Sequence, residues 1–216
     1  MLGSGIGHAE FFGIMYDKYQ NKCNWLTFFD FDEYLVLFSE ERKELSLKEF
    51  LSNKKFDHCD AIEFNWVNYG DNNLYYYDNR SSIERFTEPN FDDYSNRFVK
   101  SIIRGYLNKK VFIPGRTNHQ PIRYIKLCNS KGEIASYYPD CLIPPIYKYG
   151  YLKHFHTRTA DEYADKVVRG HPGNQALDIN ERFDLFFSKN RFSEEKLKIL
   201  EKKFNRTFNY IHWKKN

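Results

Sequence analysis

The sequence has no long hydrophobic run, and this absence excludes a conventional membrane span. No stretch approaches the roughly 18 consecutive apolar residues of a candidate transmembrane helix. The start, Met1 to Gly7, also lacks the basic and apolar segments of an export signal. Proline (7) and glycine (11) are too few among 216 residues for collagen-like or low-complexity sequence. We therefore expect a globular chain with no membrane span of its own.

Cysteine is also scarce. The four cysteines are widely spaced and form no C-x-x-C pair, so neither a zinc ribbon nor a dithiol redox motif is supported, and a thiol-rich secreted scaffold is not expected. The formal net charge is only +4, from 33 Lys+Arg against 29 Asp+Glu. The basic residues are dispersed among acidic ones, apart from a mildly basic C-terminal tail, so we expect no nucleic-acid partner.

Aromatic residues are what the sequence has in excess, with 17 Tyr, 20 Phe and 3 Trp. A hydrophobic fraction of 41% excludes a disordered chain, and a chain of this length buries about 70% of its unfolded surface. The rings must therefore either build an aromatic core or stack on a ligand. Six are expected in the core: Phe28, Phe29, Phe31, Phe183, Phe186 and Phe187.

Hydrophobic periodicity and capping residues predict strands mixed with helices. Helices are expected at 8–20, at 159–169 with Gly170 ending it, from Asp178, from Ser193 through Phe204, and briefly after the capping box Ser46 to Glu49. Strands are expected at 25–29, 34–38 and 61–69, and around 82–87, 97–103 and 122–128. A loop is expected over 71–79.

This order of elements predicts an α/β fold with a mixed sheet, flanking helices and a helical C-terminus. We see no repeat or linker, so residues 1–216 are expected to form a single domain. The nearly unbroken apolar run Trp25 to Phe29 is typical of a central strand buried on both faces. Ligands of open sheets collect at the carboxyl ends of such strands.

An acidic cluster lies at that end of the run. On an extended backbone, Asp30 and Asp32 would point to the same side about 7 Å apart, with Phe31 turned into the core. Hard carboxylate oxygens suit Mg²⁺ or Mn²⁺, which usually complete their shell with substrate phosphates. A diphosphate is the natural partner of such a site. The alternative is that the acids only mark where a strand reaches water.

Several segments in order resemble a glycosyltransferase family with the GT-A fold, the family-92-like and related family-2-like group. Trp25 to Tyr34 is similar to its W-hydrophobic-D-x-D-E-aromatic core, with Tyr for the more usual Phe. Further similar segments are Phe64 to Gly70, Glu84 to Phe86, Lys100 to Arg104, and Lys153 to Gly170, in which Arg158 and Thr159 replace Lys and Ser. Together they cover about two thirds of the chain.

The resemblance implies a metal-dependent glycosyltransferase that moves a sugar from a nucleotide-sugar donor to a glycan acceptor. It implies that Asp30 and Asp32 hold Mn²⁺ or Mg²⁺, with His154 as the third ligand, although His154 has a packing role as its alternative. A carboxylate must act as the catalytic base of an inverting reaction. Glu33 and Asp71 are the candidates, and the sequence does not choose between them.

Substrate contacts are expected from seven further residues: Trp66, Tyr69, Arg85, Lys100, His119, Arg158 and Lys166. Trp66 and Tyr69 resemble a sugar-stacking edge, while a place in the core is the alternative for Trp66. Arg85 would either make a structural pair or reach a ligand. A solvated helix face is the alternative for Lys166, and Lys100 and His119 rest on the resemblance alone.

The chain departs from the resemblance at its front. A complete GT-A domain of this group begins with a strand, a helix and a second strand that bind the nucleotide base, and only about 24 residues precede Trp25. We therefore expect those strands to be missing, because the chain is a fragment or a shortened gene product or has lost them. The compartment stays open: cytoplasmic, or membrane-associated through that missing part.

Two rival functions remain. A degenerate transferase would serve as a non-catalytic glycan-binding or interaction module. A haloacid-dehalogenase-type phosphatase also has a hydrophobic strand that ends in D-x-D, but it needs Thr or Val where Tyr34 stands. It also needs an acidic pair after its lysine, whereas Asp92 and Asp93 precede Lys100.

Overall fold

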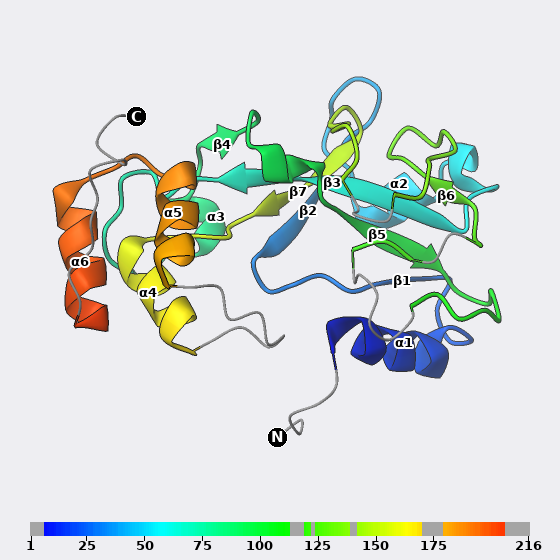
Figure 1. Ribbon diagram of the computed structural model, residues 1–216. Coiled ribbons are helices and arrows are strands. Elements are labelled where there is room, and N and C mark those ends of the chain that lie inside the picture. Colours follow the sequence, from blue (N-terminus) through cyan, green and yellow to red (C-terminus); the bar gives the residue numbers. More distant parts are fainter. Residues whose placement is uncertain (1–6, 113–118, 122–123, 139–141, 170–178, 206–216) are drawn as a thin grey trace. The chain divides into compact units, whose positions relative to one another are not determined.

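A computed structural model describes residues 7–112, 119–121, 124–138, 142–169 and 179–205. The chain forms two compact units (Figure 1). The first consists of residues 1–67 and 94–153, and the second of residues 68–93 and 154–216. Each unit is described by itself.

Strands and helices are mixed along the chain, as predicted. The strands are β1 (Trp25–Thr27), β2 (Glu33–Leu37), β3 (Ala61–Tyr69), β4 (Pro89–Asn90), β5 (Val99–Arg104), β6 (Leu127–Cys128) and β7 (Gly150–His154). The α-helices are α1 (His8–Tyr19), α2 (Leu47–Leu51), α3 (Ser82–Arg85), α4 (Ala160–Arg169), α5 (Ile179–Lys189) and α6 (Glu194–Phe204). Two short 3₁₀ helices are η1 (Lys54–Phe56) and η2 (Tyr94–Arg97).

The strands form one mixed sheet in the order β1-β5-β3-β7-β2, with β4 and β6 also paired to β3. β3 is antiparallel to β5, with Ala61 opposite Ile103 and Asn65 opposite Val99, and parallel to β6. Apolar and polar residues alternate along part of β3, but both of its faces are covered, because Glu63 and Asn65 are as buried as its apolar residues. The expected mixed α/β architecture is confirmed.

The prediction that 25–29 is the central strand is wrong. β1 has only three half-buried residues and is an end strand of the sheet order, bonded to β5. Trp25 lies under the guanidinium of Arg104, its cross-strand neighbour on β5, at 4.2 Å, and Phe28, which follows β1, stacks on Phe12 of α1 at 5.0 Å. The apolar run Trp25 to Phe29 is therefore explained by packing against α1 and against an arginine side chain. The central strand of the sheet is β3.

Local capping signals predicted the helices well. Ser46, Thr159 and Ser193 each accept a backbone N–H in the first turn of the helix that they precede. The strand expected around 82–87 is wrong, because Ser81 and Glu84 form a reciprocal capping box that starts α3 instead. Asp178 and Gly170 lie outside the described residues, and the strand expected at 122–128 is present only as β6.

The hydrophobic core is aromatic, as the composition suggested. In the first unit one cluster centres on Phe50, Phe56 and Phe64, and another joins α1 to Ile103 and Phe112. In the second unit α4, α5 and α6 enclose Phe183, Phe186 and Phe187, so the predicted stripe of α5 is buried (Figure 1).

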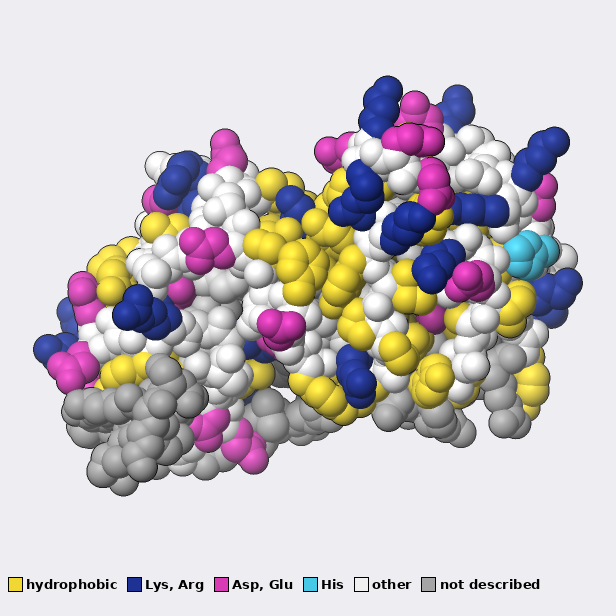
Figure 2. Space-filling model, turned by 90° about the horizontal axis from the view of Figure 1, so that it is seen from above, with side chains coloured by type: hydrophobic (Ala, Val, Ile, Leu, Met, Phe, Trp, Pro, Cys, Tyr) yellow, Lys and Arg dark blue, Asp and Glu magenta, His cyan; other side chains and the backbone are white. Residues whose placement is uncertain are grey.

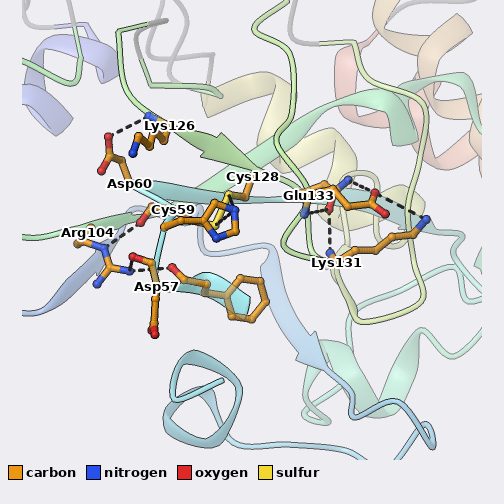
Figure 3. The surroundings of a disulfide bond; sticks show 11 residues. Asp57, Cys59, Asp60, Arg104, Lys126, Cys128, Lys131 and Glu133 are labelled. Atoms are coloured by element: carbon orange, nitrogen blue, oxygen red, sulfur yellow. Dashed lines mark hydrogen bonds and ion pairs between the residues drawn. A yellow bond between two sulfur atoms is a disulfide. The ribbon is translucent and has the colours of Figure 1, made fainter. Parts of the chain in front are cut away.

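A disulfide between Cys59 and Cys128 links the segment just before β3 to β6, 69 residues apart, and the sequence analysis did not foresee it. Both cysteines are fully buried. Arg104 donates to the carbonyls of Phe56 and Cys59, each at 2.8 Å, and so fixes the chain beside the bridge (Figure 3). Pairing is a property of the fold, which four dispersed cysteines do not reveal.

The surface agrees with the mild net charge. On the face shown in Figure 2, Lys and Arg side chains alternate with Asp and Glu, and no single basic patch dominates. Among the described helices, none has the length and apolar character needed to cross a membrane.

Candidate active site

The D-x-D segment is a tight turn between β1 and β2. The Glu33 N–H donates to the Asp30 carbonyl at 3.0 Å, and the Asp30 N–H donates to the Glu33 carboxylate at 3.0 Å. The prediction of an extended backbone here is therefore wrong, since the turn closes through both main chain and side chain. Asp32 lies at its tip and is half-buried.

Phe31 occupies the other tip position of this turn. Its exposure of 99% contradicts the prediction that it turns into the core. The reason is the turn itself: a residue at the tip of a β-turn projects outward, whereas a strand residue alternates between the two faces.

Glu33 lies beneath the turn as a buried acid. Besides the Asp30 amide, its carboxylate accepts the indole N–H of Trp66 at 2.9 Å. Burial raises the pKa of Glu33 to about 7, against the attraction of Lys100. Trp66 thus reaches across from β3 and ties the turn to the centre of the sheet.

Lys100 of β5 completes this arrangement. Its side chain is 1% exposed, and its ammonium group lies 2.8 Å from Asp30 Oδ2 and 3.7 Å from Glu33 Oε1. Burial opposes the ionisation of Asp30, but Lys100 more than offsets it, so the pKa of Asp30 lies below its usual value. Asp30 keeps 39% of its side chain exposed, and it is therefore an ionised carboxylate within reach of solvent.

His119 packs against Trp66, next to Glu33 and Lys100. Its ring lies 5.1 Å from Trp66 and 5.0 Å from Phe98, and Nδ1 is 3.2 Å from the Val99 carbonyl oxygen. Burial, followed by the charge of Lys100, lowers the pKa of His119 to about 4. It is therefore a neutral imidazole that supports Trp66.

The first unit thus brings together five residues that the sequence analysis selected separately. They are Asp30, Glu33, Trp66, Lys100 and His119. Their mutual contacts were not foreseen, because they come from β2, β3, β5 and two connecting segments.

Apart from Asp32, the remaining candidates lie in the second unit, where most have structural partners. The Asp71 carboxylate is 3% exposed and contacts the Lys196 ammonium at 2.6 Å, and burial raises its pKa against the pull of that lysine. Lys196 was not predicted to matter. It is a fully buried lysine of α6, a helix with several other lysines, so its position in the sequence does not single it out.

Arg85 has the structural pairing that was one of its two predicted roles. Its guanidinium binds both oxygens of Glu162 in α4, at 2.6 and 2.9 Å. Arg158 lies 3.8 Å from the same carboxylate and is one third exposed. Arg85 is 2% exposed, so Arg158 is the more accessible of the two guanidinium groups.

Three further candidates are held in place within the second unit. The His154 ring, 4% exposed, lies 2.9 Å from the Asn68 side-chain oxygen, and the Tyr69 ring packs against Phe155 at 5.2 Å. Lys166 donates to the His156 carbonyl at 2.9 Å. Their predicted contacts with metal, sugar and phosphate stay predictions, as do the catalytic roles of Glu33 and Asp71.

A divalent cation fits the chemistry of the D-x-D turn. Asp30 and Asp32 offer hard oxygen donors that solvent reaches, and such donors suit Mg²⁺ or Mn²⁺. Among the described residues, the one group of three or more ligand atoms within 4.8 Å is that of His58, Cys59 and Cys128. These cysteines are joined by the disulfide, so we assign no ion there.

A mixed sheet with flanking helices and a helical C-terminus defines an α/β protein and is consistent with a GT-A-like fold. The model of glycosyltransferase family 92 matches residues 17–208, which is most of the chain. The chain therefore belongs to glycosyltransferase family 92, and this membership implies a sugar donor and a glycan acceptor. No curated protein matches the chain significantly.

Replacing Trp66 by Phe tests the hydrogen bond between the Trp66 indole and the Glu33 carboxylate. The variant keeps a ring against Phe98 and His119 but removes the indole donor from Glu33. Since that hydrogen bond favours the ionised carboxylate, we expect the pKa of Glu33 to rise above about 7. We also expect the free energy of unfolding to fall by about 1 kcal/mol. Carboxyl ¹³C NMR and denaturant titration would measure the two effects.

The matched control is Trp25→Phe, since Trp25 packs under the Arg104 guanidinium rather than on Glu33. It should leave the pKa of Glu33 in place. A Trp66→Phe variant with an unchanged Glu33 titration would show that the indole does not hold this carboxylate.

Proposed function

We propose that this domain transfers a sugar from a nucleotide-sugar donor to a glycan acceptor, with a divalent cation held by Asp30 and Asp32. Family membership supplies the class of reaction. The proposal of a metal site rests on one observation: Asp30 is accessible and ionised, and it lies on a turn that contacts the buried side chains of Glu33 and Lys100.

The turn suits the task physically. A carboxylate that is already ionised need not lose a proton to accept a cation, and Asp32 stands two residues away at the tip. When bound, such a cation supplies neutralisation of the charge that grows on the departing nucleotide. Glu33 is engaged by Trp66 and by the Asp30 amide, so we assign it a positioning role rather than that of base.

The second unit offers candidates for donor and acceptor contacts. Arg158 is more accessible than Arg85, and planar guanidinium groups bind phosphate oxygens well. Tyr69 and Asp71 are buried in this structure, so sugar stacking and base catalysis by them would need those side chains to become accessible.

Calorimetric titration with Mn²⁺ and uridine diphosphate tests the proposed function. We expect the wild-type chain to bind the two together and Asp32→Asn to weaken that binding at least about tenfold, because one hard ligand is lost. Asp57→Asn, an exposed acid elsewhere in the first unit, should bind as the wild type does. Absence of binding by the wild-type chain would contradict the proposal and favour the non-catalytic module.

We also propose that the chain works in an oxidising compartment. Disulfides persist there and are rare in the cytosol. The Cys59–Cys128 bridge closes a loop of 69 residues, and its loss is expected to lower the free energy of unfolding by about 4 kcal/mol. Alkylation before reduction, followed by mass spectrometry of protein from its native source, should recover the linked peptides. Both cysteines alkylated in the folded protein would contradict this placement.

A further inference from the structure

The ammonium group of Lys100 already stands against the carboxylate that we assign to the metal. It lies 2.8 Å from Asp30 Oδ2 and is 1% exposed, with Glu33 as a second acidic neighbour at 3.7 Å. The Phe12 ring covers it at 5.6 Å. The lysine therefore approaches Asp30 from the protein interior, while 39% of the Asp30 side chain remains exposed.

This arrangement has an electrostatic consequence for any cation on Asp30. A metal ion bound by this carboxylate would stand a few ångströms from a fixed ammonium charge, and such repulsion stays large where solvent is partly excluded. The histidines near Asp30 do not relieve it, since His8 acts on Asp30 with the same sign as Lys100 and His119 is neutral. Glu33 is the nearby acid that opposes the lysine.

We propose that Lys100 is the resident counter-cation of Asp30 and competes with the divalent ion for this carboxylate. This inference rests on the proposed function, because it takes the turn as the metal site. Metal binding is weak while the ammonium group faces Asp30. It becomes tight when the ammonium group moves away from Asp30. Lys100 is thus a positioning residue that sets how tightly Asp30 can hold a cation.

Titration of Mn²⁺ into the full chain without nucleotide, followed by the electron paramagnetic resonance of free Mn²⁺, tests the competition. Lys100→Met should bind Mn²⁺ at least about tenfold more tightly than the wild type, since one like charge beside the ion is removed. Lys110→Met is the matched control. It removes the same charge from an exposed pair with Asp17 in the same unit and should change the affinity less than about twofold.

The alternative outcomes separate the two proposals. If the wild-type chain binds Mn²⁺ in a way that depends on Asp32 and Lys100→Met binds it no more tightly, the competition is wrong and the metal site stands. If neither folded protein binds Mn²⁺, with or without uridine diphosphate, both proposals are wrong. Circular dichroism establishes folding, and Lys100→Gln replaces Lys100→Met if the latter does not fold.

A measurement on the unmodified chain gives a second readout. ¹H–¹⁵N spectra of lysine ammonium groups should show a Lys100 signal that shifts on titration with Mg²⁺, because its partner Asp30 changes. The Lys110 signal should stay in place. A Lys100 signal that does not move while the Asp32 resonances respond to Mg²⁺ would overturn the inference.

Discussion

The buried carboxylate of Glu33 joins the D-x-D turn to the rest of the first unit. It receives the Asp30 amide and the Trp66 indole and lies beside Lys100, so the turn, the centre of β3 and β5 meet at one acid. A buried charge is costly unless it is paired and hydrogen-bonded. This acid meets that need with a raised pKa and these partners. The position of Asp30, and with it the candidate metal site, depends on the arrangement.

The second unit uses buried ion pairs in a comparable way. Lys196 meets Asp71 at the start of the loop after β3, and Arg85 meets Glu162 at the start of α4. Removal of one member of a buried pair leaves an uncompensated charge, which usually costs more than the pair contributes. These contacts therefore fix loops and helix ends. Asp71 and Arg85, which the sequence analysis selected as site residues, have structural partners in the fold.

Local signals in the sequence were sufficient for most of the elements. Ser46, Thr159 and Ser193 determine where helices begin through bonds within one turn, and hydrophobic periodicity predicted β3. The sequence could not rank Trp25–Phe29 against β3 as the central strand, because an apolar run has the same pattern under a helix as inside a sheet. It could not give the Cys59–Cys128 bridge or the Lys196 contact either, since those depend on residues distant in sequence. For the candidate active site, the sequence was sufficient to select the residues but not to predict their mutual contacts.

The account depends most on where a divalent cation binds. Crystals of the full chain soaked with Mn²⁺ and uridine diphosphate would give anomalous difference density that locates the ion directly. The account predicts a peak in contact with the carboxylates of Asp30 and Asp32, with the Lys100 ammonium displaced from Asp30 Oδ2. A peak at other residues, with the Lys100–Asp30 pair intact and the nucleotide bound, would contradict it.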